Sequence, residues 1–412
     1  MRRNGWTLGI LALVAVLAGV LAVGPPGGAQ EKEIVIGAVY PLSGPDALTG
    51  RTAVEALRLG VEDVNAAGGI KALGGARIRL EFADHGGKPE AGATETERLI
   101  QKGVPLVLGA WHSSVSLTAS AAAERLRTPF FVPASVADRI TERGFKYLFR
   151  LVASSKYYAR TTFDFLDDMA KRTGQKLATV GLMYEDTLYG QSTAADLKQQ
   201  AEARGLKVVA DIAYPKALRD ATAIVARLKS ARPDVFFQAS YVTDGILIRK
   251  TMAEQRFEAK ALMGHTINCV NDTYMDGLRE VAEHGFCTTG WWEDMRLPGV
   301  DVAGMGKRFK ERFGISMDDV GSLEYTAVWV VKDVLERAGS LDREKIREAF
   351  TKVDIPFGDP RNLRPNAIKF GPDGQNVHAR LIMTQVQGGK VRTVWPPEVA
   401  STQPIFPAPA PK

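Results

Sequence analysis

The stretch Val104–Arg127, VPLVLGAWHSSVSLTASAAAERLR, decides the fold. Its apolar start, Val104–Leu108, is typical of a strand buried in a parallel sheet. Gly109 ends this strand, and an Ala-rich helical segment begins at about Val115. In an open α/β sheet, a loop at the carboxyl end of a strand faces the ligand crevice. We therefore expect the loop between this strand and helix to contribute to a binding site.

The loop itself carries Trp111, His112, Ser113 and Ser114. Free N–H groups in the first turn of the following helix attract an anionic group, and the two serine hydroxyls add further donors. The loop thus predicts a site for a small carboxylate-like ligand. The alternative, that Ser113 and Ser114 only cap the helix, stays open at this point.

Strand-like and helical segments alternate on both sides of this stretch. The expected strands include 34–39, 78–84 and 130–132, and after a restart near 147–155 they include 178–184, 206–213 and 235–238. Helices are expected from 302–313, 320–337 and 343–351, before strand pieces return at 367–370, 379–386 and 391–394. Such alternation requires parallel sheets covered by helices on both faces. The sequence predicts an α/β fold with two doubly wound units.

The first 29 residues have the pattern of a secretory signal peptide. Arg2 and Arg3 precede the apolar run Leu8–Val23, and the small residues 27–29 follow it. The run of 16 residues is shorter than the roughly 20 that a membrane-spanning helix needs. We expect cleavage and export to the periplasm, and an uncleaved anchor is the alternative.

Composition narrows the function classes. Removing the leader takes away two arginines and no acid, so the formal net charge of +6 falls to +4. Basic and acidic residues are interspersed, which argues against a nucleic-acid partner. Of the chain's two cysteines, Cys269 and Cys287, the sequence allows either a disulfide or two buried thiols.

No motif for catalysis is present in the sequence. The five histidines show no metal-ligand spacing, and there is no G-x-S-x-G elbow, Walker A loop or dinucleotide fingerprint. His112 and Ser113 are adjacent in one loop, which seldom aims a base at a nucleophile, and no orienting acid accompanies them. We expect a binding protein with no cofactor and no metal.

Five segments taken in order resemble a known family: EIVIGAVYPLSGP (33–45), NAAGGI (65–70), GAWHSS (109–114), PASVADRITERGFKYLFR (133–150) and EDTLYGQ (185–191). They are similar to the bacterial leucine/isoleucine/valine-binding proteins, the periplasmic receptors of branched-chain-amino-acid-type ABC transporters. The resemblance covers roughly residues 33 to 397 and implies a type I periplasmic-binding-protein fold, with two α/β lobes joined by three crossovers. It places residues 31–153 and 291–365 in lobe one and 154–290 and 366–397 in lobe two. Residues 398–412 form a Pro/Ala-rich tail, and its composition predicts a frayed end over 403–412.

The resemblance also implies a ligand site between the lobes. Ser113 and the loop Ala134-Ser135-Val136 would hold a ligand carboxylate, and Tyr189, Tyr241 and Thr266 would close over it. The family's amino-acid binders carry an acid where this chain has Thr266, and a buried ammonium without a carboxylate is costly. Val136 replaces a hydroxyl-bearing residue, and Thr49 replaces an aromatic one. These departures argue against a plain branched-chain amino acid.

Two further features bear on the ligand. Asp244 is a candidate replacement anion, with a role in capping the following helix as its alternative. Trp111, Tyr157, Tyr189 and Tyr241 would form an aromatic wall suited to a planar or apolar ligand body. The ligand classes left open are an amino acid, an aromatic acid, an amide or urea-like solute, or another small carboxylate.

The function expected from the resemblance is a monomeric receptor that traps a small solute and delivers it to the permease of an ABC transporter. The alternative is a sensor, in which the same fold is the input of a regulatory or signalling system.

Overall fold

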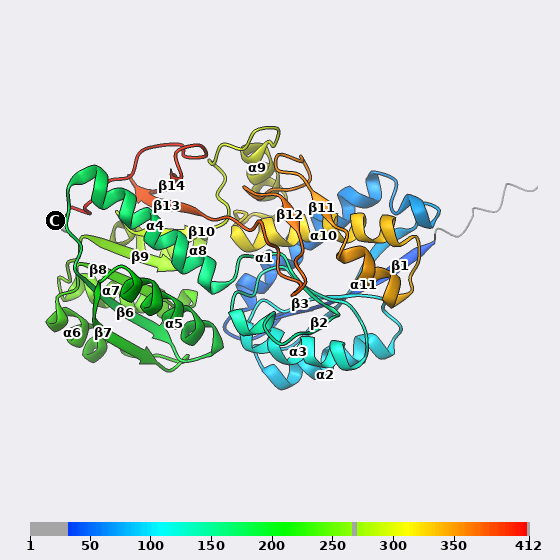
Figure 1. Ribbon diagram of the computed structural model, residues 1–412, viewed down its shortest axis with the longest axis horizontal. Helices are drawn as coiled ribbons and strands as arrows, with labels where there is room; N and C mark the ends of the chain where they lie inside the picture. Colours follow the sequence, from blue (N-terminus) through cyan, green and yellow to red (C-terminus); the bar gives the residue numbers. More distant parts are fainter. Residues whose placement is uncertain (1–31, 266–269, 410–412) are drawn as a thin grey trace, which may run out of the picture. The chain divides into compact units, whose positions relative to one another are not determined.

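The structure, a computed structural model, describes residues 32–265 and 270–409 (Figure 1). The predicted signal peptide lies outside these residues, and so do two residues singled out from the sequence, Thr266 and Cys269. The described part begins with the strand-like run EIVIGAVY, which forms β1 (Glu33–Tyr40).

The first of two large sheets has five parallel strands in the order β2-β1-β3-β4-β5. The other strands are β2 (Arg77–Asp84), β3 (Val107–Gly109), β4 (Phe130–Val132) and β5 (Leu148–Arg150). The connecting helices are α1 (Ala47–Ala66), α2 (Pro89–Gln101) and α3 (Ser113–Arg125). Successive helices connect parallel strands, which is the arrangement that the alternating pattern predicts.

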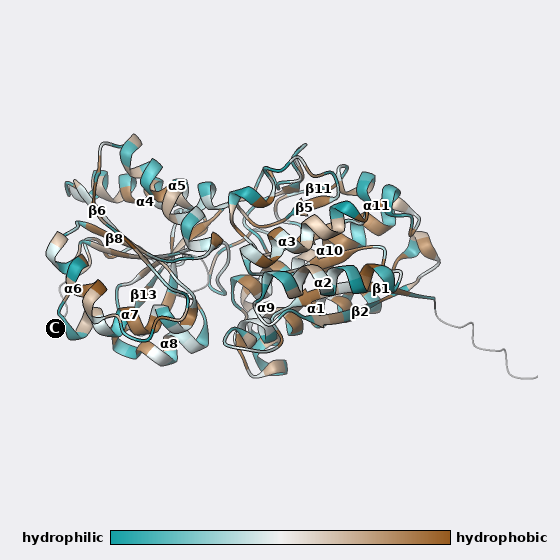
Figure 2. Ribbon diagram, turned by 90° about the horizontal axis from the view of Figure 1, so that it is seen from below, coloured by the Kyte–Doolittle hydropathy of each residue, from teal (hydrophilic) through white to brown (hydrophobic). Residues whose placement is uncertain are grey.

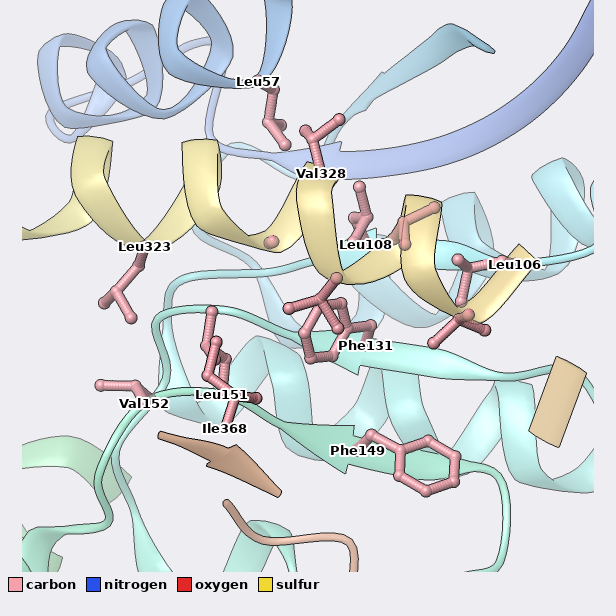
Figure 3. Packing of buried hydrophobic residues seen from close by; sticks show 14 of the residues in the cluster. Leu57, Leu106, Leu108, Phe131, Phe149, Leu151, Val152, Leu323, Val328 and Ile368 are labelled. Atoms are coloured by element: carbon pink, nitrogen blue, oxygen red, sulfur yellow. The ribbon is translucent and has the colours of Figure 1, made fainter. Parts of the chain in front are cut away.

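Both faces of this sheet are buried. On one face, alternate residues of β1 share an apolar core with α1 and with α10 (Asp319–Ala338), which packs along α1. Figure 3 shows Leu57 of α1 and Val328 of α10 above Leu108 and Phe131 of the sheet. The other face packs on α2 and α3. We call this sheet and its helices the first lobe.

The second sheet has seven strands in the order β14-β13-β10-β9-β8-β6-β7. Its parallel part is formed by β6 (Thr179–Glu185), β7 (Lys207–Tyr214), β8 (Val235–Ala239), β9 (Ala261–His265) and β10 (Phe286–Thr289), and β13 (Ile382–Gln387) and β14 (Lys390–Trp395) add an antiparallel edge. Its helices are α4 (Ser155–Thr173), α5 (Leu188–Ala203), α6 (Thr222–Ala231), α7 (Val242–Glu254) and α8 (Asp272–Leu278). We call this part the second lobe.

The chain passes between the lobes three times: after β5, after β10, and between β12 (Ile368–Lys369) and β13. After β10 it forms α9 (Val302–Phe313), α10, α11 (Arg343–Phe350) and β11 (Asp354–Ile355), which pairs with β12 in a two-stranded sheet. On α9, Arg308 forms an ion pair with Asp63 of α1. These helices therefore return to the first lobe, as expected.

The strand expected at 367–370 lies on the first lobe, not on the second as predicted. The segment 367–370 was assigned to the second lobe, but Phe370 packs against Phe131 and Phe149 of the first sheet. The side chain of Gln375 then accepts a hydrogen bond from Arg150 at 2.5 Å and donates one to the carbonyl of Val152 at 2.9 Å. These contacts keep the chain on the first lobe through residue 376.

The expectation of a frayed end over 403–412 is wrong for its described part, residues 403–409. Phe406 is buried in an apolar core of the second lobe, and the backbone N–H of Ala408 donates to the carbonyl of Lys260 at 2.8 Å. Gln385 holds the backbone of Ile405 through two hydrogen bonds of 2.8 and 2.9 Å. An aromatic anchor among the prolines is the reason that this segment docks.

Colouring by hydropathy shows apolar residues gathered along the strands and the inward faces of the helices (Figure 2). Within residues 32–265 and 270–409, none of the helices has both the length and the apolar character that crossing a membrane requires.

Candidate functional site

The predicted loop after β3 has an unusual backbone. Gly109 has φ +151°, and a Cβ there would lie 2.5 Å from the carbonyl oxygen of Val39, so only glycine fits. Trp111 has φ +69°, a left-handed conformation that is uncommon for a bulky residue. Strained backbone of this kind persists where the surroundings hold it, and it is concentrated at functional sites.

Serine side chains hold this loop in place. The hydroxyl of Ser135 donates to the carbonyl of Trp111 at 2.7 Å and lies 2.6 Å from the hydroxyl of Ser116. Ser116 in turn accepts a hydrogen bond from the backbone N–H of Ala110 at 3.0 Å. Because both contacts use the hydroxyl of Ser135, this side chain supports the loop that carries Trp111.

A buried arginine fixes the neighbouring loop, which follows β4. Arg150 is only 1 % exposed, and it donates to the carbonyl of Ala137 at 2.6 Å and to the hydroxyl of Thr141 at 2.9 Å. Burial lowers the pKa of its guanidinium to about 10, so it remains charged at neutral pH. The loop that carries Ala134 and Val136 is thereby held against the first sheet.

The two loops open onto a small cavity, about 30 Å³ in volume, that residues of both lobes enclose. Its lining consists of Trp111, Ser113, Ala134, Val136, Val152, Tyr158, Tyr189, Ser240, Tyr241, Asp319, Val320 and Leu323. A volume of this size has room for about two water molecules. A larger solute must therefore separate the lobes or displace side chains to enter.

Helix starts surround this cavity. Ser113 is the first residue of α3, Tyr189 the second of α5, and Asp319 the first of α10, while Tyr241 immediately precedes α7. The first N–H groups of a helix have no partner within it, and its macrodipole is positive at this end. Acids already accept from N–H groups at the starts of α5, α7 and α10, whereas the first turn of α3 carries no acid, so the start of α3 is the end that can receive an anionic group.

Asp319 is the only carboxylate among the described residues that line the cavity. It is buried and forms an ion pair with the buried Arg364, and the hydroxyl of Tyr158 donates to it at 3.3 Å. Arg364 also donates to the hydroxyl of Ser322 at 2.8 Å. The charge of Asp319 is thus compensated within the protein.

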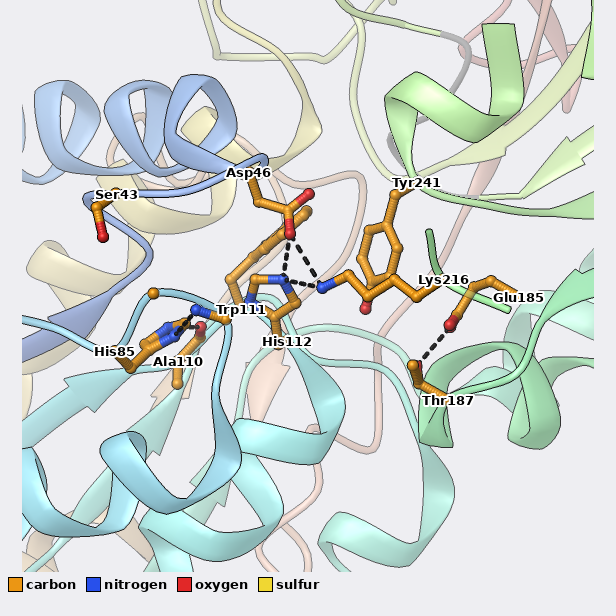
Figure 4. Close-up of polar contacts among 12 residues, drawn as sticks. Ser43, Asp46, His85, Ala110, Trp111, His112, Glu185, Thr187, Lys216 and Tyr241 are labelled. Atoms are coloured by element: carbon orange, nitrogen blue, oxygen red, sulfur yellow. Dashed lines mark hydrogen bonds and ion pairs between the residues drawn. The ribbon is translucent and has the colours of Figure 1, made fainter. Parts of the chain in front are cut away.

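A charged contact joins the lobes beside the cavity (Figure 4). Asp46, just before α1, accepts hydrogen bonds through Oδ2 from Nε2 of His112 at 2.8 Å and from Nζ of Lys216 at 3.1 Å. Lys216 follows β7 of the second lobe, and its Nζ lies 4.6 Å from the centroid of the Tyr241 ring. We call these three side chains the Asp46–His112–Lys216 contact.

The charge states in this contact follow from its surroundings. Burial raises the pKa of Asp46, but the hydrogen bond from His112 and the charges nearby outweigh it and hold that pKa below its ordinary value. Burial lowers the pKa of His112 against the opposing effect of Asp46. At neutral pH the contact therefore consists of a carboxylate, a neutral imidazole and an ammonium.

A second contact between the lobes is built from acids. Asp138 of the first lobe lies close enough to Asp196 on α5 for its charge to raise the pKa of the Asp196 carboxyl. Ser155 donates to Asp138 at 3.0 Å, and its hydroxyl lies 2.7 Å from that of Ser192. Burial, followed by Asp138, raises the pKa of Asp196 to about 8. We call this the Asp138–Asp196 contact.

Comparison with known proteins agrees with this geometry. Residues 33–390 match the model of a family described as periplasmic binding protein. A Leu/Ile/Val-binding protein homolog 8 of Brucella abortus is 30% identical over 387 residues, which cover 90% of this chain and 93% of that protein. The chain belongs to the periplasmic binding protein family.

Solved structures show the same fold. A branched-chain amino acid transporter substrate-binding protein of Streptococcus pneumoniae, in complex with isoleucine, has a TM-score of 0.76 at 19% identity and covers 89% of this chain and 100% of its own. An R. palustris solute-binding protein in complex with benzoate also has a TM-score of 0.76 at 19% identity, with coverage of 92% and 98%. The type I periplasmic-binding-protein fold, with two lobes of parallel sheet, is thus shared with both.

For this periplasmic binding protein, the structure brings five of the residues singled out from the sequence to one cavity. These are Trp111, Ser113, Ala134, Tyr189 and Tyr241. The structure does not place Ser114 or Ser135 in the lining, and it places Tyr158 there in place of Tyr157. Tyr157 instead lies beneath the guanidinium of Arg160, 5.0 Å from it. Thr266 lies outside the described residues.

Asp244 does not reach the cavity lining. It is buried at the start of α7, where it accepts hydrogen bonds from the hydroxyl of Tyr214 at 2.6 Å and from the backbone N–H of Tyr241 at 3.3 Å. Burial raises its pKa to about 6. Its capping role is therefore the one that the structure shows, and it stabilises the turn that presents Tyr241 to the cavity.

Several lining residues were not among those predicted. Tyr158 belongs to the buried stripe of α4 with Thr162 and Leu166, a spacing of four that the sequence displays. Asp319, Val320 and Leu323 begin α10, far along the chain from the other lining residues. No local pattern in the sequence links them to the loop at Trp111.

The remaining candidates are placed as follows. Cys287 is buried on β10 and takes part in a disulfide. Its predicted partner, Cys269, lies outside the described residues, and the pairing stays a prediction. Within the described ranges, no group of three or more His, Cys, Asp or Glu side chains is placed to hold a metal ion.

A larger hollow, about 890 Å³, lies at the amino ends of β8 and β9, beside Asp234 and Lys260. Ligand crevices of open α/β sheets lie at the carboxyl ends of the strands, where the smaller cavity is found. The smaller cavity is therefore the candidate site.

Proposed function

We propose that this periplasmic binding protein traps a small carboxylate solute with an apolar or aromatic body between its lobes and delivers it to the permease of an ABC transporter. The observation that carries the proposal is the single cavity that residues of both lobes and four helix starts enclose. A solute that touches both lobes stabilises the closed arrangement selectively, which is how such a receptor responds to its ligand.

The lining supports an acid without an ammonium group. The hydroxyl of Ser113 and the start of α3 suit a carboxylate, and the rings of Trp111 and Tyr241, with centroids 5.4 Å apart, suit a planar body. Asp319 is already paired with Arg364, so an entering ammonium would have to compete for it. Relatives of known structure bind isoleucine in one case and benzoate in another.

Calorimetry with matched pairs of solutes tests this proposal. Phenylalanine and 3-phenylpropionate differ only by the ammonium group, and benzoate and benzamide only by the anionic oxygen. We expect 3-phenylpropionate to bind more tightly than phenylalanine, and benzoate more tightly than benzamide. Tight binding of leucine, with no binding of either acid, would show that the proposed solute class is wrong.

The wider assignments remain proposals of the same kind. We propose that the chain leaves its solute chemically unchanged, that it acts as a monomer in the periplasm after removal of residues 1–29, and that Cys287 pairs with Cys269. We also propose lobe boundaries of 31–153 with 291–376, and 154–290 with 382–409, because the contacts of Gln375 hold the segment before β13 on the first lobe and Phe406 is buried in the second. The sensor stays an alternative prediction without an observation of its own.

A further inference from the structure

We propose that Lys216 is a positioning residue, which fastens the second lobe to Asp46 and His112 of the first and holds Trp111 and Tyr241 together as the walls of the cavity. The role in solute release rests on the proposed function, whereas the scattering test without solute does not depend on it. None of the three residues of the Asp46–His112–Lys216 contact lines the cavity.

The first step is that the contact spans the lobes. Asp46 precedes α1 and His112 precedes α3, both in the first lobe, whereas Lys216 follows β7 in the second. The side chain of His112 is 1 % exposed, that of Asp46 is 12 % exposed and that of Lys216 is 34 % exposed. Screening by solvent is therefore weaker than for an ion pair at the open surface.

The second step is that the contact reaches the cavity walls. The ammonium of Lys216 lies over the ring of Tyr241, a favourable cation–π arrangement. His112 directly follows Trp111, and the centroids of their rings are 4.4 Å apart, while the ring of His112 lies 5.5 Å from that of Tyr241. One ammonium thus connects the walls that the two lobes contribute.

The third step concerns the energetic balance. Separation of the lobes would remove Lys216 from the carboxylate of Asp46 and would part Tyr241 from Trp111 and His112. A chain with these two contacts must break them to open, so it is expected to release a bound solute about 3- to 30-fold more slowly than a chain without them.

The test compares Lys216→Met with Lys198→Met in the full chain. Lys198 is a matched control, because its side chain is 33 % exposed and pairs at 2.8 Å with Asp211 of the same lobe. Small-angle X-ray scattering without solute should show a larger radius of gyration for Lys216→Met than for wild type, with Lys198→Met unchanged. Stopped-flow release of benzoate should be about 3- to 30-fold faster for Lys216→Met alone.

Two further variants separate positioning from a general structural role. Lys216→Arg and the exchange of Asp46→Lys with Lys216→Asp both keep opposite charges across the lobes, and both should restore the wild-type radius of gyration. If Lys216→Met fails to fold, the wild-type radius of gyration should still increase between low salt and about 1 M NaCl, where the screening length is about 3 Å.

Equal scattering and equal release for Lys216→Met and Lys198→Met would overturn the proposal, and so would a charge exchange that restores nothing. Failure of benzoate to bind would count against the proposed solute class but would leave the solute-free scattering as a test of Lys216.

Discussion

The two contacts that join the lobes differ in chemistry. At the Asp46–His112–Lys216 contact an ammonium faces a carboxylate, and both carry their ordinary charges at neutral pH. At the Asp138–Asp196 contact two carboxyls lie close together, and burial, followed by Asp138, raises the pKa of Asp196. The first contact pairs opposite charges, whereas protonation of Asp196 relieves the repulsion between two carboxylates at the second. We therefore expect the second contact to be the more sensitive to pH.

The largest expected effect on solute affinity comes from removing the ring of Tyr241, on which the ammonium of Lys216 lies. Tyr241→Ala removes a cavity wall and the aromatic face beneath Lys216, and we expect it to weaken solute binding by about 1–3 kcal/mol. Tyr241→Phe retains the ring and serves as the control, with a much smaller change. Calorimetry with benzoate measures both, and equal affinities for wild type and Tyr241→Ala would remove this wall from the site.

A pH series sharpens the comparison at the acidic contact. Burial, followed by Asp138, raises the pKa of Asp196 to about 8, against an ordinary value of 3.8, and we expect opening of the lobes to relieve both effects. Its contribution to closure is therefore complete below about pH 4 and is lost as the pH rises through about 8. Because Asp196 is partly exposed, we discount this effect and expect the free energy that favours the closed form to fall by about 1–2 kcal/mol.

Asp196→Asn should remove this dependence, because an amide is uncharged at every pH. Arg150, Lys156 and the nearby serines would remain to satisfy Asp138. The radius of gyration of the wild type should increase between pH 5 and pH 9, and that of Asp196→Asn should not. Asp211→Asn, an acid outside the contact, is the control, and parallel curves for all three proteins would argue against this role of Asp196.

The smallest expected effect concerns the hydroxyls around the acids. Ser192 lies 2.7 Å from the hydroxyl of Ser155 and accepts a hydrogen bond from the backbone N–H of Asp138 at 3.3 Å. Ser192→Ala should favour the open form by about 0.5–1 kcal/mol. Ser230→Ala, which removes only a bond to its own helix, should leave the scattering unchanged. A Ser192→Ala chain that stays closed up to pH 9 would show that these hydroxyls do not act on closure.

Much of the fold was predictable because apolar runs and helical spacing are local properties of the chain. The alternation of strands and helices appears as expected, although the strand expected at 104–108 lies at Val107–Gly109 and the helix expected from about 115 begins at Ser113. The third crossover was placed too early because its position depends on the side chain of Gln375, which bonds with Arg150. A hydrogen bond between residues so far apart leaves no mark in a local pattern.

The candidate site divides in the same way. Trp111 and Ser113 follow from a strand-to-helix loop, and the resemblance to a family supplied Tyr189 and Tyr241. The sequence prediction names Tyr157, but its neighbour Tyr158 lines the cavity. Tyr158 lies on the buried stripe of α4, which the spacing of its apolar residues indicates. Asp319 could not be found, because only the folded chain brings the start of α10 to the cavity.

The small volume of the cavity has a consequence for timing. A solute cannot enter the closed chain, so association must begin from the open form, and the apparent affinity falls with the fraction of open molecules. Acidification strengthens the Asp138–Asp196 contact and thus lowers that fraction. In an acidic medium the empty chain should capture solute more slowly, while a solute already bound should have a longer residence time.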